Sequence, residues 1–353
     1  MQRLARALNV MSGNGADCII IKDIPTIRYL SGFSGDSSLL YIDAKSVVLL
    51  TDGRYVEQAE RETEQYCQVK RYDNSIWRAA AELATKHQKI GFDSAAYAYD
   101  DFTALQQVLT KQCLQPLDLK GIRICKDERE LALLRKAFKI ADDAFLRLVP
   151  EIRPGLTENI LAARLEYYMR SLGSEKVSFD TIVASGVRSS LPHGMATDKP
   201  IEIGDFITFD FGAVYGGYHS DMTRTVILGM ANSWQKEIYS IVADAQWLGL
   251  KKAGDGVTGA ELDACVRDFI VAKGYGEYFV HGLGHGVGLE IHELPNVNKR
   301  GNDTILKKGM VFSIEPGIYI PSKGGVRIED TVVLTDEGVE VLCGVSKQLM
   351  EIV

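Results

Sequence analysis

The sequence predicts an α+β protein, in which a smaller mixed α/β domain over residues 1–120 precedes a larger domain over residues 126–353 that is a duplicated half-domain. Two observations predict this class. The first part of the chain alternates helical and strand patterns, which is typical of mixed α/β domains. The second part repeats its helix starts and strand ends about one hundred residues further on, which indicates two copies of one unit. The 353 residues suffice for a core in each domain.

The elements of the first domain follow from hydrophobic periodicity and turn residues. A helix over 1–12 ends at Gly13-Asn14-Gly15, because these residues favour the backbone conformations that terminate helices. Strands over 38–42 and 46–50 flank the turn Asp43-Ala44-Lys45 and predict a hairpin. The remaining elements are expected as helices over 54–62, 76–86 and 101–111, and as strands over 17–21, 68–71, 89–92 and 113–117. Residues 118–126 are expected to form the linker.

The second domain begins with a long helix for which Asp127 is the expected N-cap. An aspartate side chain there can accept hydrogen bonds from the free N–H groups of the first turn. Pro154-Gly155 ends this segment, and a second helix is expected over 157–172. One face of the first helix is apolar at helical spacing and comprises Leu131, Leu134, Ala137, Phe138, Ala141, Phe145 and Leu148.

The repeat in this second domain is the most informative feature of the sequence. Gly155-Leu156-Thr157 opens one helix, and Gly256-Val257-Thr258 opens another, for which Thr258 and Glu261 predict a capping box. The strand-like segment 204–212 matches the segment 309–317, and each ends in a carboxylate with a glycine two residues after it. A second acid precedes the returning strand in each copy. Two facing half-domains would therefore bring four acids to one central cleft: Asp210, Asp221, Glu315 and Glu329.

The four acids have two interpretations. A single acid at a strand end more often caps a turn or pairs with a lysine or arginine than serves a site. Four carboxylates in one place repel one another and raise their pKa values unless cations neutralise them. Because both copies place acids at matching strand ends, we favour a cation site over four unrelated surface acids.

Histidines support this interpretation. Three of the six histidines, His281, His285 and His292, lie in one glycine-rich stretch. Four glycines there oppose a helix, at roughly 1 kcal/mol each relative to alanine, so we expect an extended segment and exclude the His-Glu-x-x-His helix of zincins. For an isolated histidine a core or surface position is the usual role, which we expect for His87, whereas His219 remains ambiguous.

A set of four carboxylates and one imidazole favours a harder ion such as Mn²⁺ over a thiolate-type zinc site. Two such divalent ions, bridged by carboxylates and a water, would supply a hydroxide nucleophile at neutral pH. The remaining histidines would stabilise an oxyanion or transfer protons. We expect Mn²⁺, with Co²⁺ or Zn²⁺ as alternatives.

Composition excludes several protein classes. The net charge is −7 and no basic stripe is present, so the sequence gives no electrostatic basis for nucleic-acid binding. The six cysteines are dispersed, which predicts free thiols in a reducing compartment. No apolar run has the length of a membrane span and no signal-peptide pattern is present. We therefore expect a cytoplasmic protein with no membrane partner.

Five motifs in order resemble the pita-bread metallopeptidases, and among them the proline-specific branch of aminopeptidase P and prolidase. The resemblance extends from about Lys126 to the end of the sequence, and the first domain fits through Ser31-Gly32-Phe33-Ser34-Gly35 and the stretch from Leu50 to Tyr55. The motifs are the segments 209–212, 220–225, 281–286, 315–319 and 326–330.

The resemblance implies a role for each motif residue. It implies that Asp221 and Glu329 bridge the two ions and that Glu315 also shuttles the proton of the attacking water. His193 would contact the substrate or the oxyanion, His292 would hold the scissile carbonyl oxygen, and His281 would line the proline-side pocket. Arg327 would lie outside the ligand set, where it would orient the acids and balance the charge of the cleft. The implied metal ligands are Asp210, Asp221, His285, Glu315 and Glu329.

The resemblance predicts an exopeptidase that removes an N-terminal residue from peptides with proline at the second position. Creatinase lacks this ligand set, and methionine aminopeptidase normally lacks such an N-terminal domain. An Xaa-Pro dipeptidase is the alternative, although Asn296 stands where several prolidases carry an arginine, for which Lys299 or Arg300 would have to substitute. Two further possibilities are a peptidase without a preference for proline and a non-catalytic peptide-binding protein on the same fold.

The resemblance also predicts a homodimer. In this family the N-terminal domain usually forms the dimer and walls the entrance to the active site. The loop Ser31–Ser38, which contains Asp36, is the candidate segment for reaching the partner's cleft, with an ordinary glycine-rich turn as the alternative.

Overall fold

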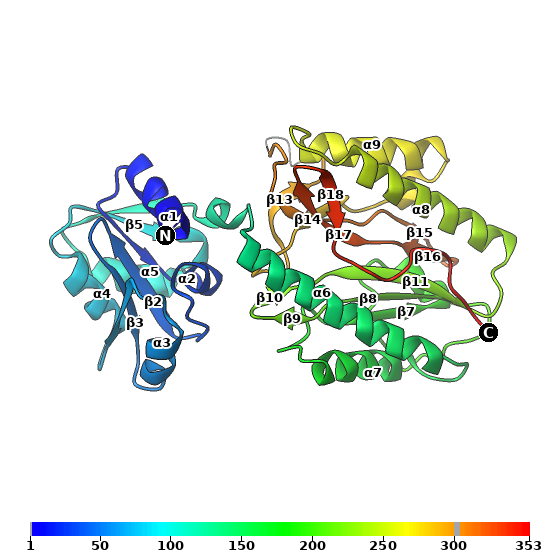
Figure 1. The fold of residues 1–353 in the computed structure, drawn as a ribbon, viewed down its shortest axis with the longest axis horizontal. Coiled ribbons are helices and arrows are strands. Elements are labelled where there is room, and N and C mark those ends of the chain that lie inside the picture. Colours follow the sequence, from blue (N-terminus) through cyan, green and yellow to red (C-terminus); the bar gives the residue numbers. More distant parts are fainter. Residues whose placement is uncertain (1, 300–303) are drawn as a thin grey trace. The chain divides into compact units, whose positions relative to one another are not determined.

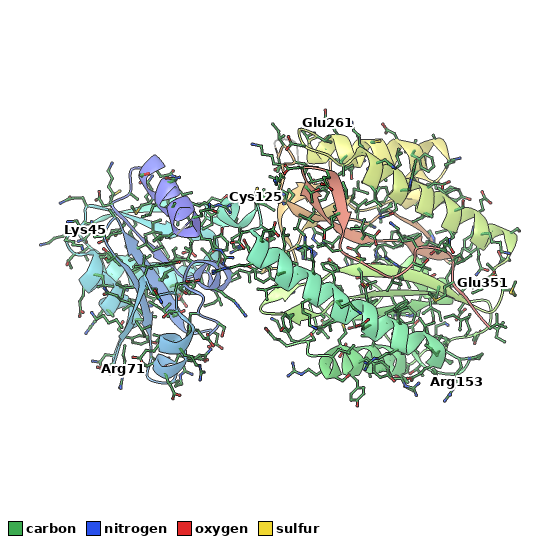
Figure 2. The ribbon with its side chains drawn as sticks, in the orientation of Figure 1. Lys45, Arg71, Cys125, Arg153, Glu261 and Glu351 are labelled. Carbon is green, nitrogen blue, oxygen red and sulfur yellow. The ribbon has the colours of Figure 1, made fainter. Side chains whose placement is uncertain are left out.

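The computed structural model describes residues 2–299 and 304–353 (Figure 1). Its contacts divide the chain into two compact units, Met1–Arg123 and Ile124–Val353. Apolar side chains fill the interior of each unit (Figure 2). All six cysteines are free thiols, as the sequence predicted.

The first unit is built on one six-stranded mixed sheet with the order β4-β3-β2-β1-β5-β6. The predicted hairpin is confirmed, because β2 and β3 are antiparallel with Leu40 opposite Leu49. Both faces of the central strands are buried, as expected for their runs of isoleucine, leucine and valine. The strands are β1 (Cys18–Ile21), β2 (Ser38–Asp43), β3 (Val47–Thr51), β4 (Cys67–Arg71), β5 (Lys89–Asp93) and β6 (Cys113–Leu117).

Five helices accompany this sheet. Asp23 caps the second of them by accepting the N–H of Thr26, and Gly32 ends it in a left-handed conformation with φ of 84°. The helices lie within a few residues of their predicted ranges, except that the helix between Asp23 and Gly32 was not anticipated. They are α1 (Gln2–Gly13), α2 (Ile24–Ser31), α3 (Val56–Glu62), α4 (Ile76–Ala84) and α5 (Tyr99–Val108).

The second unit contains two similar sheets. One has the order β19-β11-β8-β7 and the other has the order β13-β12-β14-β17-β18. In each, three antiparallel strands form an equivalent core, β7-β8-β11 in the first and β12-β14-β17 in the second. The predicted duplication and α+β class are confirmed. The core strands are β7 (Ile182–Ser185), β8 (Phe206–Phe211), β11 (Met222–Leu228), β12 (Gly284–Gly286), β14 (Val311–Ile314) and β17 (Asp330–Thr335).

A pair of helices belongs to each half, and in Figure 1 the two pairs flank the sheets. Asp127 caps the first helix and forms a capping box with Glu130, and Thr258 forms the predicted box with Glu261. The helix Ser233–Lys252 was not predicted from the sequence, because two glutamines on its buried face interrupt the apolar pattern. Within residues 2–299 and 304–353, no helix combines the length and apolar character needed to cross a bilayer. The helices of this unit are α6 (Glu128–Leu148) and α7 (Glu158–Ser171) in the first half, and α8 (Ser233–Lys252) and α9 (Gly259–Ala272) in the second.

Further strands complete this unit. They are β9 (Val214–Tyr215), β10 (Tyr218–His219), β13 (Glu293–Val297), β15 (Gly317–Ile320), β16 (Gly324–Arg327), β18 (Gly338–Val341) and β19 (Glu351–Ile352). A buried ion pair joins the halves: Arg224 on β11 lies 2.8 Å from Asp330 on β17. The strand ends that carry the predicted acids therefore belong to two sheets held directly against each other.

Candidate metal centre

The first half supplies two carboxylates from one antiparallel strand pair. Asp210 lies near the end of β8 and faces Thr223 of β11 in the register. Asp221 directly precedes β11, after the short β9–β10 turn. The other residues of β8 and β11 are buried. Because the chain returns immediately beside itself, the two acids are brought to the same end of this sheet.

The second half repeats this arrangement with glutamates. Glu315 directly follows β14, and Glu329 directly precedes β17, which pairs with β14 in antiparallel fashion. The glutamate side chains are longer than the aspartates of the first half. Glu315 starts one residue after its strand, whereas Asp210 lies within its strand. Both nevertheless line the same cavity as Asp210 and Asp221.

His285 comes from β12, and its extended conformation agrees with the sequence prediction. Glycine is required on both sides of it. A Cβ atom on Gly284 would lie 1.9 Å from the carbonyl oxygen of Ser313, and one on Gly286 would lie 2.2 Å from that of Leu294. The imidazole Nε2 lies 3.5 Å from Asp221 Oδ2 and 3.4 Å from Glu315 Oε1. The glycines thus let neighbouring strands approach and aim this ring at the acids.

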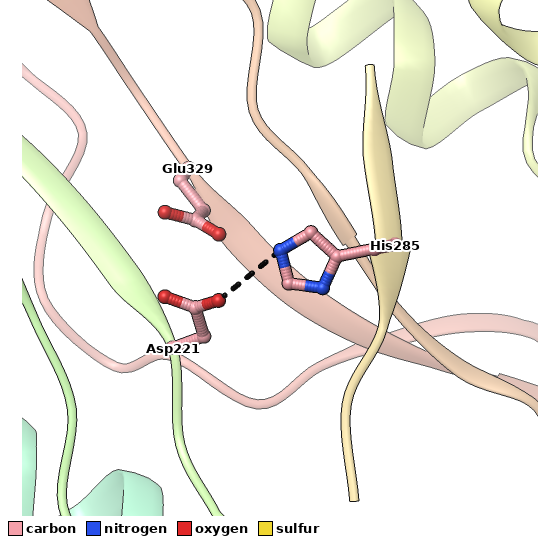
Figure 3. A group of neighbouring side chains, drawn as sticks. All are labelled: Asp221, His285 and Glu329. Atoms are coloured by element: carbon pink, nitrogen blue, oxygen red, sulfur yellow. Dashed lines mark ion pairs between the residues drawn. The ribbon is translucent and has the colours of Figure 1, made fainter. Parts of the chain in front are cut away.

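Figure 3 shows Asp221 and Glu329, each just before a strand, and His285 on β12 pointing toward one another. Each offers a ligand atom, and these atoms lie within 4.8 Å of one another. This is the spacing of a group that can bind a common ion. The buried oxygens Asp210 Oδ1 and Glu329 Oε1 accept no hydrogen bond among the described residues. Such orphan acceptors are costly in a protein interior, and a cation would satisfy them.

The electrostatics of the cluster also fit cations. Burial raises the pKa of Asp221 well above its ordinary value, and the charges of Glu329, Asp210 and Glu315 raise it further. Burial likewise raises the pKa of Glu329 and of Glu315, with Asp210 adding to both. Burial lowers the pKa of His285, which favours the neutral ring that can act as a ligand. These carboxylates need positive charge to remain ionised together.

Three neighbours orient the acids. Arg327 donates to Asp210 Oδ2 at 2.6 Å, and Thr223 donates to Glu329 Oε2 at 2.7 Å. The Ser313 hydroxyl donates to Glu315 Oε1 at 3.0 Å and accepts the N–H of His285. Each acid so held keeps its second oxygen for another partner. Hydrogen bonds of this kind behind ligand carboxylates fix their direction and tune a metal.

A cavity of about 470 Å³ surrounds the acids and is also lined by His193, His281, His292 and Arg327. The rings of His285 and His292 meet edge to face with centroids 4.3 Å apart. His281 Nε2 is hydrogen-bonded to the Tyr319 hydroxyl at 2.8 Å. Burial lowers the pKa of both His281 and His292, with the charges of His285 and His193 contributing for the latter. All nine predicted site residues therefore line one cavity.

Of the residues considered for binding a substrate carboxylate, Asn296 and Lys299 do not line this cavity. Asn296 is exposed on β13 and does not line this cavity, whereas Asn298 does. Lys299 is exposed and lines an adjacent pocket with His281 and Gly282. Arg300 lies outside the described residues.

The two histidines outside the glycine-rich stretch and the cavity have separate surroundings. His87 lies in the first unit and is hydrogen-bonded to the Tyr41 hydroxyl at 2.8 Å, which confirms its expected structural position. His219 is buried in β10, and its backbone N–H donates to the carbonyl of Gly288.

Sequence reasoning missed residues that support the site from behind. The Tyr319 hydroxyl connects His281 to Arg327, and burial raises the pKa of this phenol to about 12, so it stays protonated. Glu158, fully buried at the start of α7, accepts the backbone N–H groups of Ser185 and Thr197, which flank the loop carrying His193. The only sequence signal for Glu158 was an acid in the first turn of a helix, which is usually a surface feature.

Comparison with known proteins agrees with this geometry. A family model described as metallopeptidase family M24 matches residues 132–336, and one described as the creatinase/prolidase N-terminal domain matches residues 3–125. The chain belongs to metallopeptidase family M24. This M24 protein is accordingly a peptidase of a family that uses divalent metal ions, and the acid-rich cavity lies within the matched region.

Relatives of this M24 peptidase match it over nearly its whole length. An Xaa-Pro dipeptidase of Pyrococcus horikoshii is 39% identical over 99% of both chains. Among solved structures, an Xaa-Pro dipeptidase from Bacillus anthracis has a TM-score of 0.96 and 41% identity over 99% of each chain. An X-Pro aminopeptidase from Thermotoga maritima has a TM-score of 0.90 and 41% identity, covering 98% of this chain and 99% of that one. The predicted family is confirmed.

Proposed function

We propose that this M24 peptidase is a dinuclear-metal exopeptidase that hydrolyses the bond between an N-terminal residue and a following proline. The observation that carries the proposal is the convergence of four carboxylates and one neutral imidazole on a cavity, with two buried carboxylate oxygens left without a hydrogen-bond donor among the described residues. Relatives described as Xaa-Pro dipeptidase and X-Pro aminopeptidase support the substrate class.

The five residues of this cluster would hold the ions, and the family resemblance assigns Asp221 and Glu329 as the pair that both ions would share. One of the pair comes from each half, and both belong to the group whose ligand atoms lie within 4.8 Å of one another. Bound divalent ions lower the pKa of water and polarise a carbonyl oxygen, which supplies a nucleophile at neutral pH. The oxygen-rich donor set favours Mn²⁺, with Co²⁺ or Zn²⁺ as alternatives. The proposed ligands are Asp210, Asp221, His285, Glu315 and Glu329.

Glu315 is the proposed acid–base residue. Its Oε1 is fixed by the Ser313 hydroxyl, which leaves the other oxygen able to accept a proton from the attacking water. Burial raises the pKa of this carboxyl, which favours acceptance of that proton, and the departing proline nitrogen, a stronger base than a carboxylate, then takes it. One group thus performs both proton transfers.

Three histidines are proposed to bind the substrate. His193 and His292 are exposed within the cavity and are assigned to the scissile carbonyl oxygen and the oxyanion that develops from it. His281, more deeply placed and bonded to Tyr319, is assigned to the proline side. Arg327, buried and bonded to Asp210, keeps the acid cluster oriented and offsets its negative charge.

The aminopeptidase and the dipeptidase are supported equally by the relatives. A dipeptidase needs a cation beside the proline carboxylate. Lys299, the described cation that follows Asn296 most closely in the sequence, lines the pocket next to the cavity and not the cavity itself. For this reason the aminopeptidase stays our first assignment and the dipeptidase stays the alternative.

We further propose a cytoplasmic homodimer formed through residues 1–120, with the loop Ser31–Ser38 near a partner's cleft. Asp36 in this loop is held by the Tyr55 hydroxyl at 2.6 Å, which supports a defined loop conformation.

The test uses purified protein with added Mn²⁺ and three peptides: Ala-Pro, Ala-Pro-Ala and Ala-Ala-Ala. The proposal expects release of alanine from Ala-Pro-Ala but not from Ala-Ala-Ala, whereas hydrolysis of Ala-Pro alone would assign the dipeptidase. Asp221→Asn and His285→Ala should each lose both bound metal and activity. Asp244→Asn, on helix α8, is the matched control for an acid outside the cavity. Full activity in the two site variants would refute the proposed centre.

A further inference from the structure

A buried ion pair on helix α9 lies directly behind the loop that carries His281. Asp263 and Arg267 are one helical turn apart, and their side chains are 0% and 11% exposed. Two parallel hydrogen bonds of 2.8 Å join them, from Arg267 Nε to Asp263 Oδ2 and from Arg267 Nη2 to Asp263 Oδ1. This bidentate arrangement fixes the plane of the guanidinium group.

The pair holds the loop at three backbone atoms. Arg267 Nη1 donates to the carbonyl of Phe279 at 2.8 Å, and Nη2 donates to the carbonyl of His281 at 2.6 Å. Asp263 Oδ1 accepts the N–H of Leu283 at 2.9 Å. These atoms alternate along the chain at positions 279, 281 and 283. The backbone on either side of His281 is therefore fixed by one acid and one base.

Ring contacts complete the arrangement. The Arg267 guanidinium lies over the Phe279 ring at 4.1 Å, and that ring meets the His281 ring edge to face at 5.2 Å. On its other side the His281 imidazole is bonded to the Tyr319 hydroxyl. The imidazole is thus placed between a phenol on β15 and a loop whose backbone is held from α9.

Stability alone does not account for this pair. A buried ion pair contributes little net stability compared with well-packed apolar side chains, because removing both charges from water is costly. The pair instead fixes the position of the loop backbone, because a guanidinium can bind a carboxylate and two carbonyl groups at once in a fixed plane. Lysine has one ammonium group and cannot reproduce all of these directions.

We propose that Arg267, oriented by Asp263, is a positioning residue for His281 and thereby sets the selectivity for proline after the scissile bond. The selectivity part rests on the proposed function, whereas the placement of His281 does not. Neither residue lines the cavity that holds the acids, so the pair acts on that cavity through the loop, and Arg267 itself lines the adjacent pocket with Lys299. The first half of the unit offers a parallel, because buried Glu158 holds the ends of the loop that carries His193.

The placement is tested by NMR on full-length protein labelled at histidine and loaded with diamagnetic Zn²⁺. His281→Gln assigns the His281 ring signal among the six histidines. Arg267→Met and Asp263→Asn should shift, split or broaden that signal, and Arg267→Lys should do so less. Leu262→Ala is the matched control, because Leu262 is fully buried on the same helix but packs into the apolar core. An unchanged His281 signal in Arg267→Met would overturn the proposal.

The selectivity is tested by comparing kcat/KM for Ala-Pro-Ala and Ala-Ala-Ala with added Mn²⁺. For Arg267→Met we expect the preference for proline to fall by about 10- to 100-fold, the cost typical of misplaced supporting groups. The loss should appear mainly in KM, with bound metal unchanged and partial recovery in Arg267→Lys. A preference equal to that of Leu262→Ala would overturn the selectivity claim. If the wild-type protein shows no preference for proline, the proposed function fails, and the NMR result still decides the placement of His281.

Discussion

The hydroxyl of Thr223 donates to Glu329 Oε2 at 2.7 Å and so connects a strand of one half to a ligand candidate of the other. The same hydroxyl accepts from Arg327 Nε at 2.9 Å. Because Arg327 in turn holds Asp210, one buried threonine links two acids that come from different sheets. The two halves are coupled at the level of single side chains as well as through their packing.

Thr223→Val should weaken metal binding without disturbing the fold. Valine has the shape of threonine but removes the donor to Glu329 and the acceptor for Arg327. We expect metal affinity to fall by about 10- to 100-fold, as is usual when a hydrogen bond behind a ligand is lost. Titration of the chelated protein with Mn²⁺ measures this. Thr208→Val is the control, since Thr208 is buried on the neighbouring strand and its hydroxyl is hydrogen-bonded to that of Thr225; equal affinities in both variants would contradict the expectation.

Glu158→Gln should impair substrate binding rather than metal binding. The Glu158 carboxylate accepts hydrogen bonds from Ser185, Arg188 and Thr197, and a glutamine would turn an N–H group toward some of these donors. We expect KM for a cleaved peptide to rise about tenfold, within the range for supporting residues, with bound metal unchanged. Glu166→Gln, at a half-buried acid on the same helix, should behave like the wild type. A loss of metal in Glu158→Gln would show that its role is different.

Removal of metal should destabilise the second unit selectively. The clustered acids repel one another once their cations are gone. At a free ion concentration 100-fold above Kd, each bound ion contributes about 2.7 kcal/mol, so chelation should lower the unfolding temperature by about 5–10 °C for each ion removed. Trp234 and Trp247 report on this unit by fluorescence. The shift should be absent in Asp221→Asn; a shift that persists there would indicate another binding site.

The first unit should lose stability as the pH rises, because of Asp93. Burial raises the pKa of Asp93 from about 3.8 to about 7, although the N–H groups of Lys22 and Asp23 oppose this. A pKa raised by folding means that the folded state binds the proton more tightly. The resulting stabilisation is complete below pH 4 and is lost as the pH rises to 7.

Asp93→Asn should therefore flatten the pH dependence of this unit between pH 4 and 7. Urea midpoints followed by Trp77, in a background without the other two tryptophans, measure it. Asp100→Asn, at an exposed acid, should keep the wild-type slope. If Asp93→Asn keeps the full wild-type slope of stability against pH, groups other than Asp93 control the pH dependence of this unit.

The sequence predicted the parts of the fold and site that depend on local pattern. The Gly-x-Thr helix starts and the acid–glycine strand ends repeat along the chain, so the duplication and the convergence of the acids followed from spacing. The glycines around His285 excluded a helix, and the structure shows β12 there. The resemblance to a known family then gave each of these residues a candidate role.

The parts that the sequence did not predict depend on contacts between distant segments. Glu158, Asp263 and Arg267 lie on helices as ordinary charged residues, and only folding shows that each holds a histidine loop. By sequence position Asn296 stands where several prolidases carry an arginine, but in the structure Asn298 lines the cavity and Asn296 does not. The helix Ser233–Lys252 was missed because Gln235 and Gln246 lie on its buried face while Trp247 is exposed, which weakens the apolar stripe in the sequence.

The ligand candidates are divided between the halves, two from the first and three from the second, and the Arg224–Asp330 pair lies along their seam. Neither half alone can assemble the complete donor set. Activity should therefore be sensitive to substitutions all along this seam, because a change that lets the sheets part by a small amount separates intact donors. Inactive variants of this protein are then expected to map to a line between two sheets as well as to the five donor positions.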